Sequence, residues 1–147
     1  MKFAAFFFFY CYIGLVLAAG FWGAFLGADF DHQMLFKLDT GTLSEYSRTN
    51  MLSQYRFLRA MEFGYGLFAI TFRKEIFSVK KFNRLYLVIM LAGVLARIVS
   101  LVDEGSPSAL FWFFLAFESL GVVIIYIYFN QKKKPETAEH THRKINR

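Results

Sequence analysis

Four long apolar runs constrain this chain more than any other feature. They cover roughly residues 3–27, 51–72, 85–102 and 107–129, and charged or turn-forming residues bound each of them. A helix crosses a hydrocarbon core of about 30 Å with about 20 mostly apolar residues. A spanning segment must satisfy its own backbone hydrogen bonds, and the runs lack the alternation of barrel strands. The sequence therefore predicts an all-α polytopic membrane protein, a bundle of four transmembrane helices.

The composition agrees with a membrane domain and not with a soluble one. Hydrophobic residues make up 56% of the 147 residues, and 20 residues are Phe, which is more than a small soluble domain can hide from water. The single cysteine, Cys11, leaves no pair for an intrachain disulfide. We expect one transmembrane domain over residues 1–130 and a disordered, basic cytoplasmic tail over 131–147. The predicted helices cover about 3–27, 43–73, 84–102 and 107–129.

The distribution of Lys and Arg predicts the orientation. If the N-terminus is cytoplasmic, the outer side carries only Lys37 and Arg48. The inner side then carries twelve basic residues: Lys2, Arg73, Lys74, Lys80, Lys81, Arg84, Lys132, Lys133, Lys134, Arg143, Lys144 and Arg147. The positive-inside rule therefore places both ends in the cytoplasm. Tyr126 and Tyr128 then lie at the inner membrane boundary, where aromatic side chains are common.

Local signals predict two helix starts and the helix contacts. Thr42-Leu43-Ser44-Glu45 fits a capping box, which would start the second long helix after an outer loop that begins at Asp29. Ser106 suits an N-cap and Pro107 the first helical position. Small residues spaced four apart predict close helix packing within the chain, at Ala19, Gly23 and Gly27, at Ala60 and Gly64, and at Ala92 and Ala96.

Ionisable and polar residues inside the apolar runs are the candidate site. They are Arg56, Arg59, Glu62, Arg97, Ser100, Asp103 and Glu118. A charge in a bilayer costs a few kcal/mol or more unless it is paired or hydrated, so these residues should face one another. At about 1.5 Å per residue, Glu62, Arg97 and Glu118 all lie in the outer half of the hydrocarbon core. We expect one polar pocket that opens toward the outside.

Two interpretations of this pocket stay open. As a ligand-binding site, its arginines hold an anionic headgroup or carboxylate. As a structural device, Arg97 pairs with Glu118 and Arg59 pairs with Glu62, which specifies how the helices pack. The sequence contains no metal set, cofactor motif or catalytic motif that would identify an enzyme.

Three weaker signals have ordinary explanations. Asp39-Thr40-Gly41 resembles an aspartic-protease triplet, but it occurs once, and Asp and Gly favour a turn. His140 and His142 are too few for a metal site in a polar tail, and His32 is expected to be an isolated loop histidine. The basic residues adjoin apolar runs, so the expected partners are membrane lipids and other membrane proteins, not nucleic acid.

Several residues of the last three runs carry a resemblance to a known family. They are Arg59, Gly64 and Gly66, then Ala96, Arg97, Ser100, Asp103, Gly105, Pro107 and Ser108, and finally Glu118. With these residues the chain resembles a bacterial family of small four-helix membrane proteins catalogued as domain of unknown function 4345. The resemblance covers roughly residues 50–130 well and the first run loosely. It implies a four-helix fold in the bacterial inner membrane and a grouping of Arg97, Asp103 and Glu118.

Three functions remain open from the sequence. The first is a non-enzymatic bundle that binds a lipid-like ligand or serves as an accessory subunit of a membrane complex. The second is an intramembrane enzyme, an isomerase or a lipid-modifying one, that uses Glu118 or Glu62 as acid and base. The third is a proton or ion pathway, which four helices of one chain could form only as an oligomer.

Overall fold

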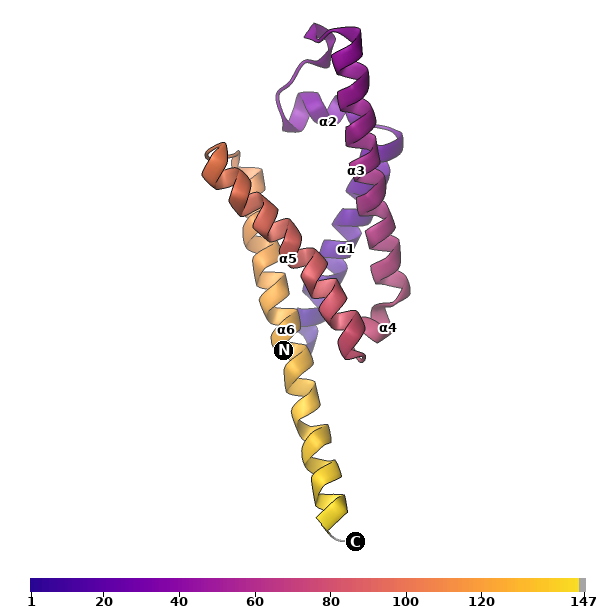
Figure 1. The fold of residues 1–147 in the computed structure, drawn as a ribbon, viewed down its shortest axis with the longest axis vertical. Coiled ribbons are helices and arrows are strands. Elements are labelled where there is room, and N and C mark those ends of the chain that lie inside the picture. The colour runs from indigo at the N-terminus through magenta and orange to yellow at the C-terminus, as the bar shows by residue number, and fades with distance from the viewer. Residues whose placement is uncertain (146–147) are drawn as a thin grey trace. The chain divides into compact units, whose positions relative to one another are not determined.

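The computed structural model describes the backbone of residues 1–145 and the side chains of residues 1–131. All its regular elements are helices, and no strand occurs in the described backbone, which confirms the all-α class. In chain order they are α1 (Lys2–Phe25), α2 (Ala28–Leu35), the 3-10 turn η1 (Thr40–Thr42), α3 (Glu45–Thr71), α4 (Arg73–Ile76), α5 (Lys80–Asp103) and α6 (Ala109–Ile145), as Figure 1 shows.

Three of these helices are long and apolar enough to cross a membrane. They are α1, α5 and the segment Ala109–Gln131 of α6. The fourth predicted span, α3, has 27 residues but does not reach the same hydropathy. Arg56, Arg59 and Glu62 lie in its middle, and Glu45 and Arg48 in its first turns, so its apolar stretches are short. A crossing by α3 and the cytoplasmic position of the two ends stay predictions.

The chain divides into two compact units, here called unit 1 and unit 2. Unit 1 contains Met1–Cys11 and the chain from Phe72 onward, and unit 2 is Tyr12–Thr71. In unit 1, α5 and α6 lie side by side (Figure 1). The first residues of α1 add rings to the end of this pair where α5 begins: Phe9 is buried, with its ring centroid 5.1 Å from that of Phe77 and 5.3 Å from that of Tyr86. Aromatic packing thus holds the start of the chain in unit 1.

Unit 2 is built on close contact between α1 and α3. A Cβ at Gly20 would lie 2.7 Å from the backbone nitrogen of Phe63, so the two backbones approach directly there. A Cβ at Gly23 would lie 2.7 Å from the Arg59 side chain. The predicted stripe of Ala19, Gly23 and Gly27 is therefore partly wrong. Ala19 is exposed, and Gly20 makes the closest approach because its face of α1 is the one that meets α3.

Both predicted helix starts are displaced along the chain by two residues. α3 is capped by Ser44, whose hydroxyl accepts a hydrogen bond from the Ser47 amide at 3.2 Å. Thr42 instead donates to the Asp39 carbonyl within the η1 turn, so the proposed capping box does not form. At α6 the first amides bond the carbonyl of Ser108, not Ser106, and the Ser106 hydroxyl accepts from the Trp112 indole. Two Ser or Thr residues lie two positions apart before each helix, Thr42 and Ser44 or Ser106 and Ser108, so the pattern alone does not choose the cap.

The last helix extends beyond the predicted fourth run. α6 continues to Ile145, whereas the prediction ends the helix at residue 129. The described side chains stop at Gln131, so the basic residues of the tail, His140 and His142 lie outside them. A disordered tail over 131–147 stays a prediction.

Candidate functional site

An ion pair joins α5 to α6 in unit 1. Arg97 Nε lies 3.0 Å from Glu118 Oε2, and Arg97 Nη2 lies 3.2 Å from Glu118 Oε1, so the contact is bidentate. Glu118 is buried with 8% of its surface exposed, and a third of the Arg97 side chain is exposed. The guanidinium also lies within 6 Å of the ring centroids of Phe111 and Phe114. The predicted pairing of Arg97 with Glu118 is confirmed.

This geometry limits what the pair can do chemically. Both carboxylate oxygens of Glu118 accept hydrogen bonds from the permanently charged Arg97 guanidinium, so the carboxylate is held in one orientation. Arg97 uses two of its nitrogens, and Nη1 has no partner among the described residues. The pair therefore offers the two N–H bonds of an oriented Nη1 group beside two aromatic rings.

The other two predicted members in unit 1 do not join the pair. Ser100 donates its hydroxyl proton to Glu104, and both residues are exposed. Asp103 is exposed at the end of α5 and forms no hydrogen bond or ion pair with a described residue. Only Arg97 and Glu118 of the predicted grouping are in contact.

A second polar network lies in unit 2. Arg59 Nη1 lies 2.6 Å from Glu62 Oε2, which confirms the other predicted pair. Arg59 Nε donates to the Tyr55 hydroxyl at 2.8 Å, and that hydroxyl donates to Asp31 Oδ2 at 2.8 Å. The Trp22 indole donates to the other oxygen of Asp31 at 3.2 Å. The network thus joins α1, α2 and α3.

Sequence reasoning missed the centre of this second network. Asp31 and His32 are both buried in α2, a helix that falls within the predicted outer loop. His32 is therefore not an isolated loop histidine: its Nδ1 donates to the Ala28 carbonyl at 2.7 Å, and its ring centroid lies 4.6 Å from that of Tyr55. Asp29 and Asp31 in the first turn of α2 were an available signal, since acidic residues favour helix N-termini.

Arg56 contributes least to this network. It is exposed, and its Nη1 reaches only the Ala24 carbonyl at 3.4 Å. Arg56, Arg59 and Glu62 belong to unit 2, while Arg97, Ser100, Asp103 and Glu118 belong to unit 1. Each unit carries its own polar group, and a single pocket shared by all seven residues stays a prediction. In the described part of the chain no three His, Cys, Asp or Glu side chains gather in a way that could hold a metal ion.

The start of α2 is tied to the start of α3 by Asp29. Its carboxylate accepts a hydrogen bond from the Thr40 hydroxyl at 2.8 Å and pairs with Arg48 at 3.0 Å. The Thr40 hydrogen bond, with the Arg48 contact, lowers the pKa of Asp29 below its ordinary value. The Asp39-Thr40-Gly41 segment is a turn, as predicted, because the Gly41 amide donates to Asp39 Oδ1 at 2.9 Å.

Acid should weaken the contacts of Asp29 with Thr40 and Arg48. Because the pKa of Asp29 is lowered in the folded chain, its stabilising contribution is complete above the ordinary Asp pKa of about 3.9 and is lost as the pH falls through the lowered value. We expect amide hydrogen exchange over residues 29–44, corrected for intrinsic pH dependence, to rise as the pH falls below about 4. Asp29→Asn should show the faster exchange already at pH 6. An unchanged pH profile in Asp29→Asn would contradict this role.

Comparison with known proteins identifies the family of the chain and leaves its activity open. No curated protein and no solved structure matches the chain. One family, described as "Domain of unknown function (DUF4345)", matches over residues 4–129. This range includes most of α1, which the resemblance covered loosely, together with both polar networks. Since the match extends over most of the 147 residues, the chain belongs to the DUF4345 family.

Proposed function

We propose that this chain is a small, non-enzymatic, multi-pass protein of the bacterial inner membrane, which binds an anionic, lipid-like ligand or serves as an accessory subunit of a membrane complex. The observation that carries the proposal is the Arg97 guanidinium, which a buried carboxylate holds in place while its Nη1 group stays without a partner among the described residues. A fixed guanidinium beside aromatic rings suits a phosphate or carboxylate on an apolar molecule.

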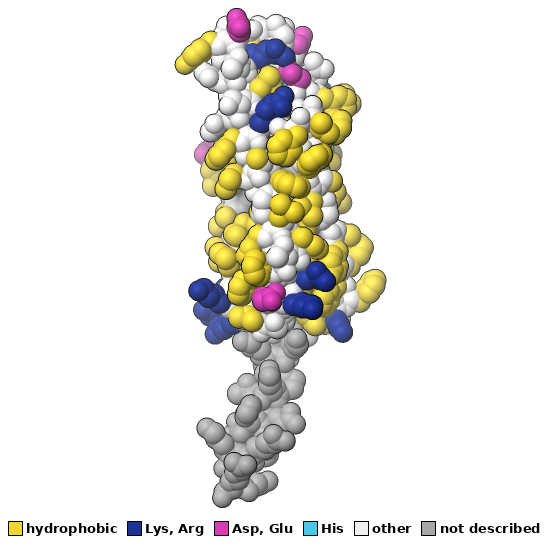
Figure 2. All heavy atoms as spheres, turned by 90° about the vertical axis from the view of Figure 1, so that its right-hand side faces the viewer, with side chains coloured by type: hydrophobic (Ala, Val, Ile, Leu, Met, Phe, Trp, Pro, Cys, Tyr) yellow, Lys and Arg dark blue, Asp and Glu magenta, His cyan; other side chains and the backbone are white. Residues whose placement is uncertain are grey.

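The exposed apolar surface supports placement in a membrane. In the most apolar stretches of α1, α5 and α6, only 22%, 22% and 17% of the residues are buried within the chain. Figure 2 shows hydrophobic side chains exposed over much of the face in view. Such a surface needs lipid or other protein chains around it.

The geometry of α3 supports a fourth crossing. Its 27 residues span about 40 Å, which exceeds the hydrocarbon thickness of about 30 Å. Arg59 is neutralised by Glu62, and it also donates a hydrogen bond to the Tyr55 hydroxyl. Paired charges of this kind are the form in which ionisable residues occur in membrane spans. With four crossings both termini lie on one side, and the basic residues put that side in the cytoplasm.

Labelling of single cysteines tests the topology. In a Cys11→Ser background, Gln33→Cys should react with a membrane-impermeant maleimide on intact cells, and Lys80→Cys should react only after permeabilisation. Both positions are exposed and belong to segments at opposite ends of α3 in the chain. Equal labelling of both positions on intact cells would contradict a crossing by α3.

An enzymatic alternative rests on Glu62. Glu118 has both oxygens occupied, but Glu62 uses one oxygen for Arg59, and its side chain is 48% exposed. An isomerase or lipid-modifying enzyme could use such a carboxylate as acid and base. Loss of a lipid-modifying activity in Glu62→Gln, without loss of folding, would replace the non-enzymatic proposal.

Native mass spectrometry of the protein, extracted gently from its own membrane, tests the binding role. We expect a reproducible lipid-like adduct or stoichiometric companion chains, and we expect the adduct or the companions to be lost in the double variant Arg97→Met/Glu118→Met. The double change removes the pair without leaving a buried charge alone. Arg48→Ala, which removes an exposed pair in unit 2, is the control and should retain them. A folded double variant with unchanged adducts and companions would overturn the proposal.

A further inference from the structure

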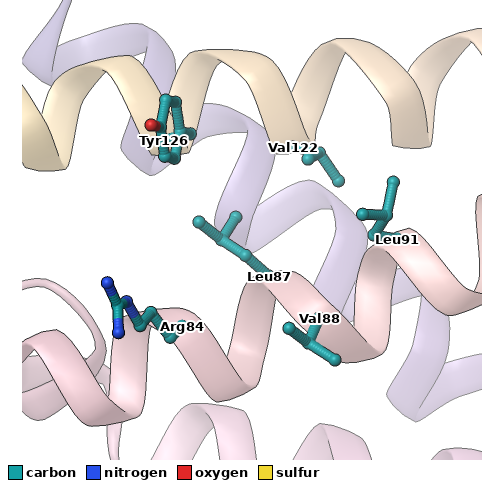
Figure 3. Close-up of a pocket in the computed structure, with 6 residues that line it drawn as sticks. All are labelled: Arg84, Leu87, Val88, Leu91, Val122 and Tyr126. Carbon is teal, nitrogen blue, oxygen red and sulfur yellow. The ribbon is translucent and has the colours of Figure 1, made fainter.

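An open groove lies between α5 and α6 in unit 1. Its volume is about 330 Å³, and six residues line it: Arg84, Leu87, Val88, Leu91, Val122 and Tyr126 (Figure 3). On α5, Leu87, Val88 and Leu91 lie three, four and seven residues after Arg84, which is the spacing of a single helix face. Val122 and Tyr126 are four apart on α6 and form the other wall. The groove is therefore continuous along both helices.

The lining of the groove is apolar, and the polar groups that flank it lie at one end only. Figure 3 shows the Arg84 guanidinium and the Tyr126 hydroxyl at the same end, while Leu91 and Val122 lie toward the other end. Between them the walls are formed by the aliphatic side chains of Leu87 and Val88. A ligand that fills such a groove has an apolar chain and a polar group at one end.

The charge at the polar end selects an anion. Arg84 is exposed and has no hydrogen-bond or ion-pair partner among the described residues. Lys80 and Lys81 precede it by one turn on α5 and are also exposed. Between Phe72 and Arg84 the chain has five basic residues and one acidic residue, Glu75. The field at this end of the groove is positive, so it favours a phosphate group.

The groove lies at the depth where a membrane lipid would meet it. Arg84 is the last charged residue before the apolar stretch of α5, and Tyr126 has the amphipathic side chain typical of the membrane boundary. From Arg84 to Leu91 the helix rises about 10 Å into that apolar stretch. An acyl chain of the same leaflet runs in this direction, with its phosphate at the level of Arg84.

We propose that this groove binds an anionic phospholipid, with one acyl chain along Leu87, Leu91 and Val122 and the phosphate at Arg84 and the Tyr126 hydroxyl. This inference rests on one part of the proposed function, namely that α5 and α6 cross the bilayer. The site is separate from the Arg97 and Glu118 pair. Arg97 follows Leu91 on α5 and Glu118 precedes Val122 on α6, so the pair lies beyond the end of the groove that is opposite Arg84.

Lipid binding in nanodiscs of defined composition tests the site. The full chain is placed in phosphatidylcholine with a minority of phosphatidylglycerol, and lipids retained after transfer to detergent are counted by native mass spectrometry. The unaltered chain should retain phosphatidylglycerol selectively. Arg84→Ala should reduce its retention about five- to ten-fold, because one cation near a membrane surface contributes about 1 kcal/mol and a direct phosphate contact adds to it. Arg84→Lys should restore part of the selectivity.

A second variant separates the acyl-chain site from surface charge. Leu91→Trp fills the groove and leaves every basic residue in place, so it should also abolish selective retention, whereas Val99→Trp, at an exposed position of α5 outside the groove, should not. The Arg97→Met/Glu118→Met variant leaves the groove intact and should retain phosphatidylglycerol. The groove can therefore be tested even if the Arg97 and Glu118 pair binds no ligand. Equal retention of both lipids, or a dimer that Leu91→Trp abolishes without any bound lipid, would overturn the proposal.

Discussion

Glu118→Leu is expected to destabilise the chain by about 3–5 kcal/mol, the largest effect of any single substitution considered. The change removes the carboxylate that holds two nitrogens of Arg97 and leaves that guanidinium without a counter-charge between α5 and α6. Unfolding with increasing sodium dodecyl sulfate in mixed micelles, followed by Trp fluorescence, measures the free energy of unfolding. Glu118→Gln should lose less, because its amide oxygen still accepts a hydrogen bond from Arg97.

The double variant Arg97→Met/Glu118→Met provides the control for this prediction. Removing both charges together replaces the pair with apolar groups of similar length, so the double variant should recover most of the stability that Glu118→Leu loses. If the single and double variants are equally unstable, the loss comes from packing around Glu118 and not from an unpaired charge. If Glu118→Leu unfolds like the unaltered chain, the ion pair does not stabilise the contact between α5 and α6.

Gly20→Ala is expected to destabilise unit 2 by about 1–3 kcal/mol, although alanine is the better helix former. The added Cβ would lie 2.7 Å from the Phe63 nitrogen and 3.0 Å from the Arg59 carbonyl oxygen, and neither backbone atom can rotate away. α1 and α3 must separate to admit it. The same unfolding titration measures the loss.

Two other glycines serve as matched controls for Gly20. Gly14, in the same helix, and Gly64, in the partner helix α3, have no heavy atom within 4 Å of an added Cβ. Gly14→Ala and Gly64→Ala should therefore stabilise their helices slightly or leave them unchanged. The prediction fails if all three alanine variants behave alike, because the effect would then come from helix propensity and not from contact between the helices.

The ion pairs could be predicted from the sequence because few arrangements satisfy a charge inside an apolar helix. Arg97 and Glu118 each lie in an apolar run, on neighbouring helices joined by a short turn, so they are natural partners. Arg59 and Glu62 are three residues apart on one helix, where side chains meet regardless of the rest of the fold. Local spacing and the cost of burying a charge are enough for both predictions.

Other parts of the site depend on contacts that spacing does not reveal. The burial of Asp31 follows from hydrogen bonds to Trp22 and Tyr55, which are 9 and 24 residues away in the chain. The groove at Arg84 exists because the side chains of α5 and α6 leave a space between them, and Leu87 and Val122 look like any other lipid-facing residues in the sequence. Neither feature has a local signature.

Hydropathy and helical periodicity are local properties, so the amino-acid order alone predicts that the chain is helical, where the long apolar helices lie and which charges inside the apolar runs pair. Packing sets the remaining features: which glycine forms the contact between α1 and α3, that α2 contributes a buried aspartate to the polar network of unit 2, and where a groove opens beside Arg84. These features depend on which helix faces meet. That choice is made by the packing of side chains far apart in the chain, which no single stretch of sequence encodes.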